Sequence, residues 1–341
     1  MKYLRKILLP FSVVYWVVTS LRNLFYNTGI FKSYKFSLPV IAIGNLSTGG
    51  TGKTPQTEYL IRLLKDRYSL AVLSRGYRRS TKGFVLADAN STPRQIGDEP
   101  SQMHAKFSQI TVAVDADRCN GITQLLKHLT KPEIIVLDDA YQHRRLKAGF
   151  YILLTAYGDL YADDWLLPAG NLRESCSGAQ RANVIVVTKC PADMLLSEQQ
   201  KIKDKLHRYS AQEVCFTTVS YDDSVYNGTL KIPVEELYKT EKVLVAGIAK
   251  PKTFFDYLSD GSTVCKAYPD HHDFTSNELD ELSKIAKEKL IVTTEKDYVR
   301  LKGKIPSEKL FYLPMQTVFI SGGSIFNKKI TDYVEQSSGS R

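Results

Sequence analysis

Short apolar runs alternate with amphipathic stretches along the chain from residue 37 onward. This alternation is typical of a mostly parallel sheet covered by helices, because strands buried on both faces are apolar along their length. It predicts strands at residues 39–43, 70–73, 110–114, 134–137, 151–155, 184–187 and 214–221. It predicts helices at residues 53–66, 122–129 and 197–209.

A second set of elements follows the polar, turn-rich stretch at residues 222–228. We expect strands at 242–246 and 290–294, and helices at 253–258 and 276–289. The pattern therefore predicts an α/β protein in three parts. These parts are an N-terminal helix (1–36), a core with a parallel sheet and helices on both faces (37–221), and a smaller α/β domain (222–341).

The first of these parts holds a membrane-like segment. Residues 7–18, ILLPFSVVYWVV, are almost wholly apolar and follow the basic stretch MKYLRK. A membrane-spanning helix needs roughly 20 apolar residues, and Pro10, Ser12 and Arg22 limit this run, so we expect shallow or oblique insertion from the cytosolic face. Two alternatives stay open: a buried core helix, and a cleaved signal peptide, although no A-x-A-like cleavage site follows.

Composition and charge support this picture. The chain has 341 residues, 43% apolar and 24% charged, which suits two domains and excludes a disordered or multi-span membrane protein. The net charge is +10, but six basic residues lie in the first 36, so the remainder carries +4. This asymmetry favours an anionic membrane surface over nucleic acid. The five scattered cysteines contain no C-x-x-C pair and indicate reduced thiols in a cytosolic protein.

The most specific motif is PVIAIGNLSTGGTGKTPQ at residues 39–56, a strand followed by a glycine-rich turn and a helix. Gly49, Gly50 and Gly52, with Thr51 between them, would let backbone N–H groups face a phosphate at the helix N-terminus. Lys53 would neutralise the β and γ phosphates, and the hydroxyl of Thr54 would ligate Mg²⁺. The strict phosphate-loop pattern has glycine where this chain has Ser47. An ordinary glycine-rich turn is the alternative.

Two acids, Asp138 and Asp139, end the apolar strand EIIVL. Carboxylates at a strand end beside a phosphate loop are suited to hold a nucleotide-bound Mg²⁺, although they could also cap a turn. His143 and two arginines follow at once. These could contact nucleotide or substrate, or form a solvated basic turn.

Further charged clusters lie at other turns. Asp98 in IGDEP and the run at 270–273, DHHD, are candidates for proton transfer, with loop capping as the alternative. Arginines at strand ends can clamp phosphates or simply be solvated. The charged or aromatic residues at these turns are Arg75, Tyr77, Arg78, Arg79, Arg118, Arg173 and Glu174.

Six segments together resemble the tetraacyldisaccharide 4′-kinase family: GNLSTGGTGKTP, SRGYRR, GDEP, LDDAYQHRRL, LPAGNLRE and PDHHDF. The resemblance covers nearly the whole chain. It implies transfer of the γ-phosphate of ATP, with Mg²⁺, to the 4′-hydroxyl of a tetraacylated glucosamine disaccharide 1-phosphate. It also implies action in lipid A biosynthesis at the cytoplasmic face of the inner membrane of Gram-negative bacteria. The enzyme would be peripheral or anchored by a single helix, with no nucleic acid and no obligate protein partner.

The resemblance also implies roles for individual residues. Lys53 and Thr54 would serve phosphate and Mg²⁺, with Asp138 and Asp139 as the acids of the Walker B strand. Asp98 would be the catalytic base, supported by His271, although the doublet His271-His272 leaves open which imidazole does so. The residues expected to line the cleft are Arg75, Tyr77, Arg118, His143, Arg173 and Glu174.

Two positions depart from the family pattern, and two rival functions remain. Ala140-Tyr141 stands where Gly-Phe is common, and Asn171 replaces a common Pro or similar residue in LPAG-x-LRE. One rival is a non-catalytic membrane-binding module with a vestigial nucleotide site, against which the retention of Lys53, Thr54, Asp138, Asp139 and Asp98 argues. The stronger rival is a regulatory phosphate-loop GTPase or ATPase at the membrane. The stretch VIVVTKCPAD approaches a guanine-reading motif, but Pro191 stands where the base-reading Asp is expected.

Overall fold

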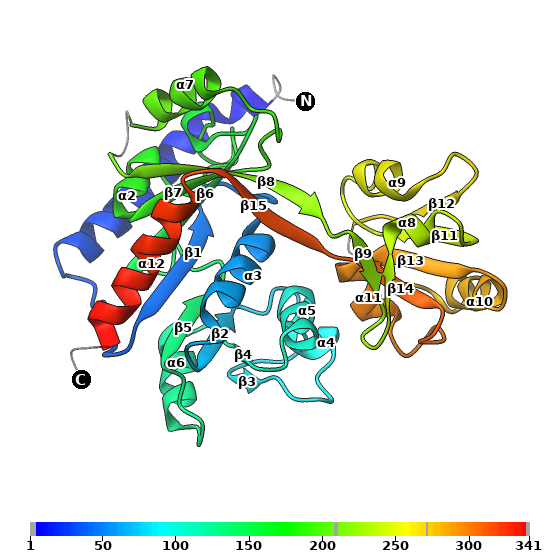
Figure 1. Ribbon diagram of the computed structural model, residues 1–341. Helices are drawn as coiled ribbons and strands as arrows, with labels where there is room; N and C mark the ends of the chain where they lie inside the picture. Colours follow the sequence, from blue (N-terminus) through cyan, green and yellow to red (C-terminus); the bar gives the residue numbers. More distant parts are fainter. Residues whose placement is uncertain (1–4, 208–210, 271, 339–341) are drawn as a thin grey trace.

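The computed structural model describes residues 5–207, 211–270 and 272–338. It contains two β-sheets with helices packed on them, joined by two long neighbouring strands (Figure 1). The expected α/β fold is therefore confirmed. We call the larger sheet with its helices the first unit, and the smaller sheet with its helices the second unit.

The sheet of the first unit has nine strands in the described part of the chain. In spatial order they are β15 (Met315–Ser321), β8 (Glu213–Tyr221), β7 (Val184–Thr188), β6 (Phe150–Ala156), β1 (Val40–Asn45), β5 (Ile134–Leu137), β2 (Leu70–Ser74), β4 (Thr111–Val114) and β3 (Val85–Leu86). The pairings from β8 to β4 are parallel, and only the two edge pairings are antiparallel. Strands β1, β2, β5 and β7 are buried at every position, which explains their continuous apolar runs.

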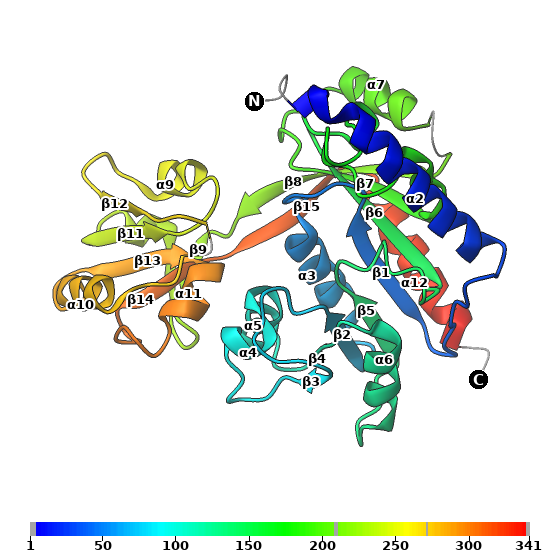
Figure 2. The ribbon, with the colours of Figure 1, turned by 180° about the vertical axis from the view of Figure 1, so that it is seen from behind.

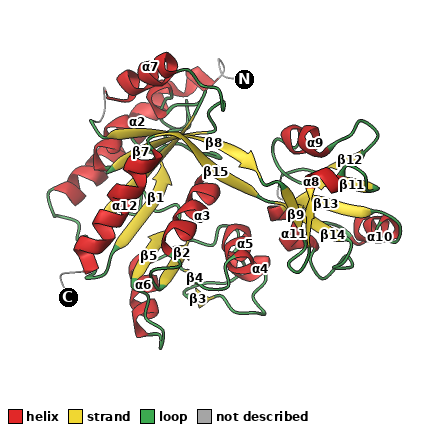
Figure 3. Ribbon diagram, viewed as in Figure 1, coloured by secondary structure: helices red, strands yellow, loops and turns green. Residues whose placement is uncertain are grey.

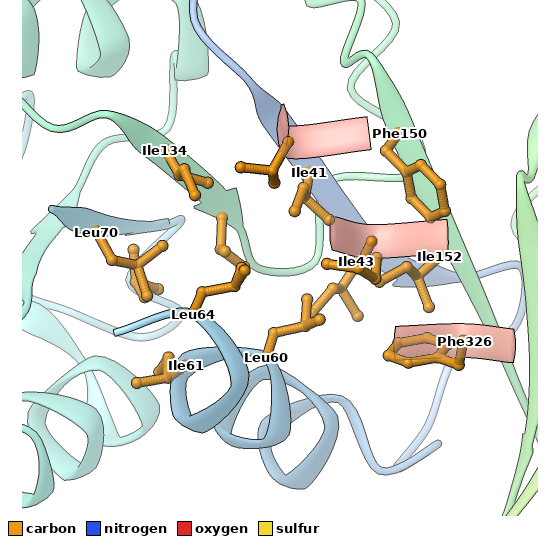
Figure 4. Packing of buried hydrophobic residues seen from close by; sticks show 14 of the residues in the cluster. Ile41, Ile43, Leu60, Ile61, Leu64, Leu70, Ile134, Phe150, Ile152 and Phe326 are labelled. Atoms are coloured by element: carbon orange, nitrogen blue, oxygen red, sulfur yellow. The ribbon is translucent and has the colours of Figure 1, made fainter. Parts of the chain in front are cut away.

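Helices cover both faces of this sheet. Ile41 and Ile43 of β1 pack with Leu60 of α3 and Phe326 of α12 in one core (Figure 4). The alternate residues of β1 lie in the opposite core with Ile122 of α6. The helices of this unit are η1 (Lys6–Leu8), α2 (Leu9–Asn27), α3 (Lys53–Leu64), α4 (Pro93–Ile96), α5 (Asp98–Lys106), α6 (Arg118–Lys127), η2 (Tyr161–Asp163), η3 (Cys176–Arg181), α7 (Leu196–His207) and α12 (Gly323–Ser338).

The second unit is built on a smaller, six-stranded sheet. Its strands, in spatial order, are β10 (Lys231–Pro233), β9 (Ser224–Tyr226), β14 (Leu310–Leu313), β13 (Leu290–Thr294), β11 (Lys242–Ala246) and β12 (Val264–Ala267). Its helices are α8 (Val234–Leu237), α9 (Lys252–Leu258), α10 (Ser276–Ile285) and α11 (Glu295–Leu301). Figure 3 shows them on the two sides of the sheet.

The two units are joined by β8 and β15, which pair antiparallel from Met315 with Tyr221 onward. The chain enters the second unit through β8 and returns through β15, and α12 then packs in the core of the first unit. The proposed division at residue 222 remains a prediction. Residues 315–338 nevertheless lie with the first unit, although the sequence pattern grouped them with the second.

Several helix boundaries differ from those expected, and helix α5 was not expected. Helix α6 begins at Arg118 rather than at 122, because the Asp117 side chain accepts hydrogen bonds from the N–H groups of Cys119 and Asn120 and so caps the helix earlier. Helix α10 ends at Ile285 rather than at 289. The acids of IGDEP lie in the first turn of α5 rather than in a loop. Their negative charges interact favourably with the positive end of the helix dipole.

The N-terminal helix α2 lies over the outside of the first unit (Figure 2). In the described part of the chain, no helix is both long and apolar enough to span a membrane. Ser12 and Tyr15 hold α2 to the loop before η3: the Ser12 hydroxyl donates to Leu166 O at 3.0 Å, and the Tyr15 hydroxyl to Arg173 O at 2.9 Å. Most large apolar side chains of α2 are exposed, Phe11 by 64%, so the alternative of a buried core helix is wrong.

Candidate active site

The glycine-rich loop lies between β1 and α3, at the carboxyl end of the parallel strands. Gly49 and Gly52 have φ of +125° and +78°, a backbone conformation that other residues rarely adopt. The carboxyl end of β7 holds the loop, since the Thr188 hydroxyl donates to Thr51 O at 2.8 Å and the Lys189 ammonium donates to Gly50 O. The loop is therefore held in place before any ligand binds.

Lys53 is the first residue of α3 and points back across the strand ends. Its ammonium donates to Asn45 Oδ1 at 3.3 Å and lies 3.7 Å from the Asp139 carboxylate. Thr54 follows in the same helical turn. The geometry thus places one cation between the glycine-rich loop and the acids of β5.

Asp138 and Asp139 follow β5 and differ in environment. Asp138 is buried, and its two carboxylate oxygens accept hydrogen bonds from Thr57 and Ser74, each at 3.4 Å. Burial, reinforced by the charge of Asp139, raises the pKa of Asp138 to about 6. Asp139 is partly exposed, has φ of +48° and lies 3.4 Å from the guanidinium of Arg173. The site therefore carries negative charge that a cation would stabilise.

The residues present suit a hard divalent cation. Thr54, Asp138 and Asp139 offer only hydroxyl and carboxylate oxygens, the ligands that Mg²⁺ prefers. Close by, the hydroxyl of Thr51 is buried and has no hydrogen-bond partner among the described residues. Such a donor is available to a bound ligand.

Arg118 is buried behind these two acids and is not exposed to solvent. Its guanidinium is buried and donates to Asp115 O at 3.0 Å and to Asp138 O at 3.3 Å. Burial lowers the pKa of Arg118 to about 10. Its side chain therefore supports the backbone of the two acids and adds a fixed positive charge under them.

His143 lies near Arg118 in the turn after β5. Burial, together with that charge, lowers the pKa of His143 to about 4, so its imidazole is neutral at physiological pH. Potential ligand atoms of His143, Asp117 and Cys119 lie within 4.8 Å of one another. Asp117 already caps α6 and pairs with Arg145 at 2.7 Å, which is a structural role.

The remaining cleft residues divide into exposed and buried ones. Arg75 and Tyr77 follow β2 and are exposed. Arg173 contacts Asp139, as described above. Glu174 is buried, and Arg181 binds both its carboxylate oxygens at 2.8 Å. Asn23 of α2 also donates to Glu174, at 3.2 Å, so this carboxylate links the N-terminal helix to the first unit.

Asp98 is the first residue of α5 and contacts the second unit. Its carboxylate pairs with Arg300 of α11, with Nη2 and Oδ2 2.5 Å apart. His271 lies outside the described residues, so its expected role stays a prediction. The ring of His272 bonds to Glu278 at 2.9 Å and stacks on Tyr268.

Sequence reasoning missed several contributors to the site. Asn45, Thr57 and Ser74 contact the expected residues from α3 and neighbouring strand ends. The charge of Glu99, beside the expected base, also raises the pKa of Asp138. Their only sequence signal is their position at or just after a predicted strand end, or in the first turns of a helix. Arg300, more than 200 positions from its partner, left no such signal.

Comparison with known proteins agrees with this geometry. A family model described as tetraacyldisaccharide-1-P 4′-kinase matches residues 4–335. A tetraacyldisaccharide 4′-kinase of Flavobacterium psychrophilum is 53% identical over 340 residues, covering 99% of both chains. One of Bacteroides thetaiotaomicron is 42% identical, covering 98% of this chain and 94% of the relative.

A solved structure is also similar over nearly the whole chain. It is a crystal structure of LpxK from Aquifex aeolicus in complex with ATP, with a TM-score of 0.79 and 30% identity. It covers 97% of this chain and 99% of that one. Sequence, fold and site geometry agree, and the chain belongs to the tetraacyldisaccharide 4′-kinase family.

Proposed function

We propose that this protein transfers the γ-phosphate of ATP to the 4′-hydroxyl of a tetraacyldisaccharide 1-phosphate, a step of lipid A biosynthesis. One observation carries the chemistry: Lys53 and the acids Asp138 and Asp139 meet beside a preformed glycine-rich loop. Family membership supplies the acceptor, and the Aquifex aeolicus relative is described as a complex with ATP.

The phosphate side of the reaction depends on positioning and charge. Backbone N–H groups of residues 49–52 and the N-terminus of α3 bind the β and γ phosphates. Lys53 exchanges its contact with Asp139 for the phosphate oxygens, which carry more charge. Bound Mg²⁺, held by Thr54, Asp138 and Asp139, would neutralise charge on the phosphates.

The acceptor side requires a proton acceptor. Asp98 takes the proton of the 4′-hydroxyl as the oxygen attacks, with His271 supporting the carboxylate. Exposed Arg75 and Tyr77 are placed to contact the sugar phosphate, while Arg173 and neutral His143 orient groups near the acids. Arg118 and Glu174 hold the walls of this cleft.

The N-terminal helix suits a membrane-bound substrate. Its polar contacts to the loop at 166–174 leave Phe11, Val14, Trp16 and Val18 exposed. Apolar side chains on the outward face, with the basic residues of the first 36 positions, match an anionic lipid interface. We infer peripheral binding at the cytoplasmic face of the bacterial inner membrane, without nucleic acid or an obligate protein partner.

The test is transfer of labelled phosphate from ATP to tetraacyldisaccharide 1-phosphate in detergent micelles. We expect transfer by the wild type and its loss in Lys53→Ala and Asp98→Ala. Lys252→Ala, which removes an exposed lysine of the second unit paired with Asp256, is the matched control. Hydrolysis of ATP or GTP without lipid phosphorylation would refute the proposal and favour a nucleotide switch.

A further inference from the structure

One arginine of the second unit binds the carboxylate of Asp98. Arg300 donates from Nε to Oδ1 at 3.3 Å and from Nη2 to Oδ2 at 2.5 Å. The two side chains are largely buried, with 12% and 15% exposed. This two-pronged geometry fixes the plane of a carboxylate as well as its charge, which a lysine cannot do.

The same guanidinium also binds the backbone at His272. Its third nitrogen, Nη1, donates to His272 O at 2.6 Å. Arg300 therefore joins three parts of the chain: α11, the start of α5 and the loop between β12 and α10. Each of the three guanidinium nitrogens donates one hydrogen bond to these acceptors.

The helix that carries Arg300 is anchored against α5 and the second sheet. At the other end of α5, Lys106 binds Glu295, the first residue of α11, and also Glu58 of α3 at 2.6 Å. In the second unit, Asp297 accepts a hydrogen bond from Gly247 N at 2.8 Å. These contacts set the position of Arg300 before substrate binds.

We propose that Arg300 is a positioning residue for phosphoryl transfer, acting through Asp98; this rests on the proposed role of Asp98 as base. An ionised carboxylate has about four lone-pair sites, and the guanidinium fork occupies two of them. The fork thereby also fixes the directions in which the other lone pairs of the carboxylate point. Arg300 thus orients the base and makes its orientation depend on the second unit.

The experiment measures kcat and KM for Arg300→Gln, Arg300→Lys and the control Lys252→Gln, with ATP and tetraacyldisaccharide 1-phosphate in micelles. Misplacing a catalytic group by about 1 Å can cost on the order of 100-fold in rate. We expect Arg300→Gln to lose about 10- to 100-fold in kcat, with KM for ATP changed by less than about twofold. Arg300→Lys keeps the charge without the fork and should recover only part of kcat.

A double variant separates positioning from a general structural effect. Asp98→Asn already removes the base, so Arg300→Gln added to it should reduce kcat no further. Free guanidinium should restore part of kcat to Arg300→Ala, whereas equal ionic strength from sodium chloride should not. Thermal melts of each variant establish that the chain is folded.

The outcomes distinguish this inference from the proposed function. Full activity in Arg300→Gln, a rise in KM for ATP alone, or multiplicative losses in the double variant would overturn the positioning role while leaving Asp98 as base. Full activity in Asp98→Ala would overturn both.

Discussion

Lys106 is the only cation we find in ion-pair contact with Glu295 among the described residues, and it also pairs with Glu58. All three side chains are at most 15% exposed. Lys106→Met leaves Glu58 with Arg62 at 3.0 Å and Gln102 at 2.9 Å, whereas Glu295 keeps only the N–H of Met315 among the contacts described. The loss of folding stability therefore comes mainly from the unpaired carboxylate of Glu295.

The magnitude follows from this burial. Removing one partner of a buried ion pair costs about 3–5 kcal/mol, and we expect the lower end because Glu295 can take up a proton. With about 2.1 cal/mol/K of unfolding entropy per residue, a loss of about 3 kcal/mol in 341 residues lowers Tm by about 4 °C. The control Lys252→Met should shift Tm by less than about 1 °C, since exposed pairs contribute little.

The loss of stability in Lys106→Met should also depend on pH. Burial, with the charge of Glu58, raises the pKa of Glu295 from 4.5 to about 7. The folded state thus holds a proton that the unfolded state releases, so this group's contribution to stability falls as pH rises from 4.5 to 7. Without Lys106 the pKa of Glu295 rises further, and the deficit of the variant should grow by up to about 1.4 kcal/mol per pH unit above 7.

Calorimetric melts at pH 6 and pH 8 check this prediction. Glu295→Gln added to Lys106→Met should recover most of the lost stability and remove the extra deficit at pH 8, because no buried charge remains unpaired. A deficit equal at both pH values, or a double variant no more stable than Lys106→Met, would refute the reasoning.

Three further predictions concern the first unit. Glu174→Gln leaves the buried guanidinium of Arg181 without its bidentate partner and should cost about 3 kcal/mol of stability in denaturant melts; a loss under about 1 kcal/mol would contradict it. Ser12→Val removes two hydrogen bonds that hold α2, and hydrogen exchange should show faster opening of that helix with the rest of the first unit unchanged. Thr188→Val leaves Thr51 O without its donor and should raise KM for ATP about tenfold, while an unchanged value would show that this contact does not hold the loop.

The central strands and the glycine-rich loop could be predicted because their signals are local. The stretch at 39–56 carries strand, turn and helix patterns in sequence, and the structure has all three. The meeting of Lys53 with the acids after β5 was also predictable, since the carboxyl ends of parallel strands share one edge of a sheet. These parts follow from periodicity, glycine conformation and the shared edge of parallel strands.

The contacts between the units could not be predicted in this way. Asp98 and Arg300 are 202 positions apart, and Lys106 and Glu295 are 189 apart, so no periodic pattern joins them.

Two helices that were not predicted did have a signal in the sequence. Helix α11 begins after Thr294, which caps it and accepts a hydrogen bond from Asp297 N, three residues later. Helix α12 had one too, in the apolar spacing of Phe326, Ile330 and Val334.

The return of the chain through β15 has a consequence for synthesis on the ribosome. Residues 224–313 emerge before residues 315–338, so the second unit has its whole sheet available while the first still lacks an edge strand and α12. Phe326, Ile330 and Val334 are fully buried in the finished protein, where they cover one face of the first sheet. Until these residues are synthesised, that face stays uncovered. Chains stalled before residue 315 therefore expose apolar surface, which makes them targets for chaperones and proteases.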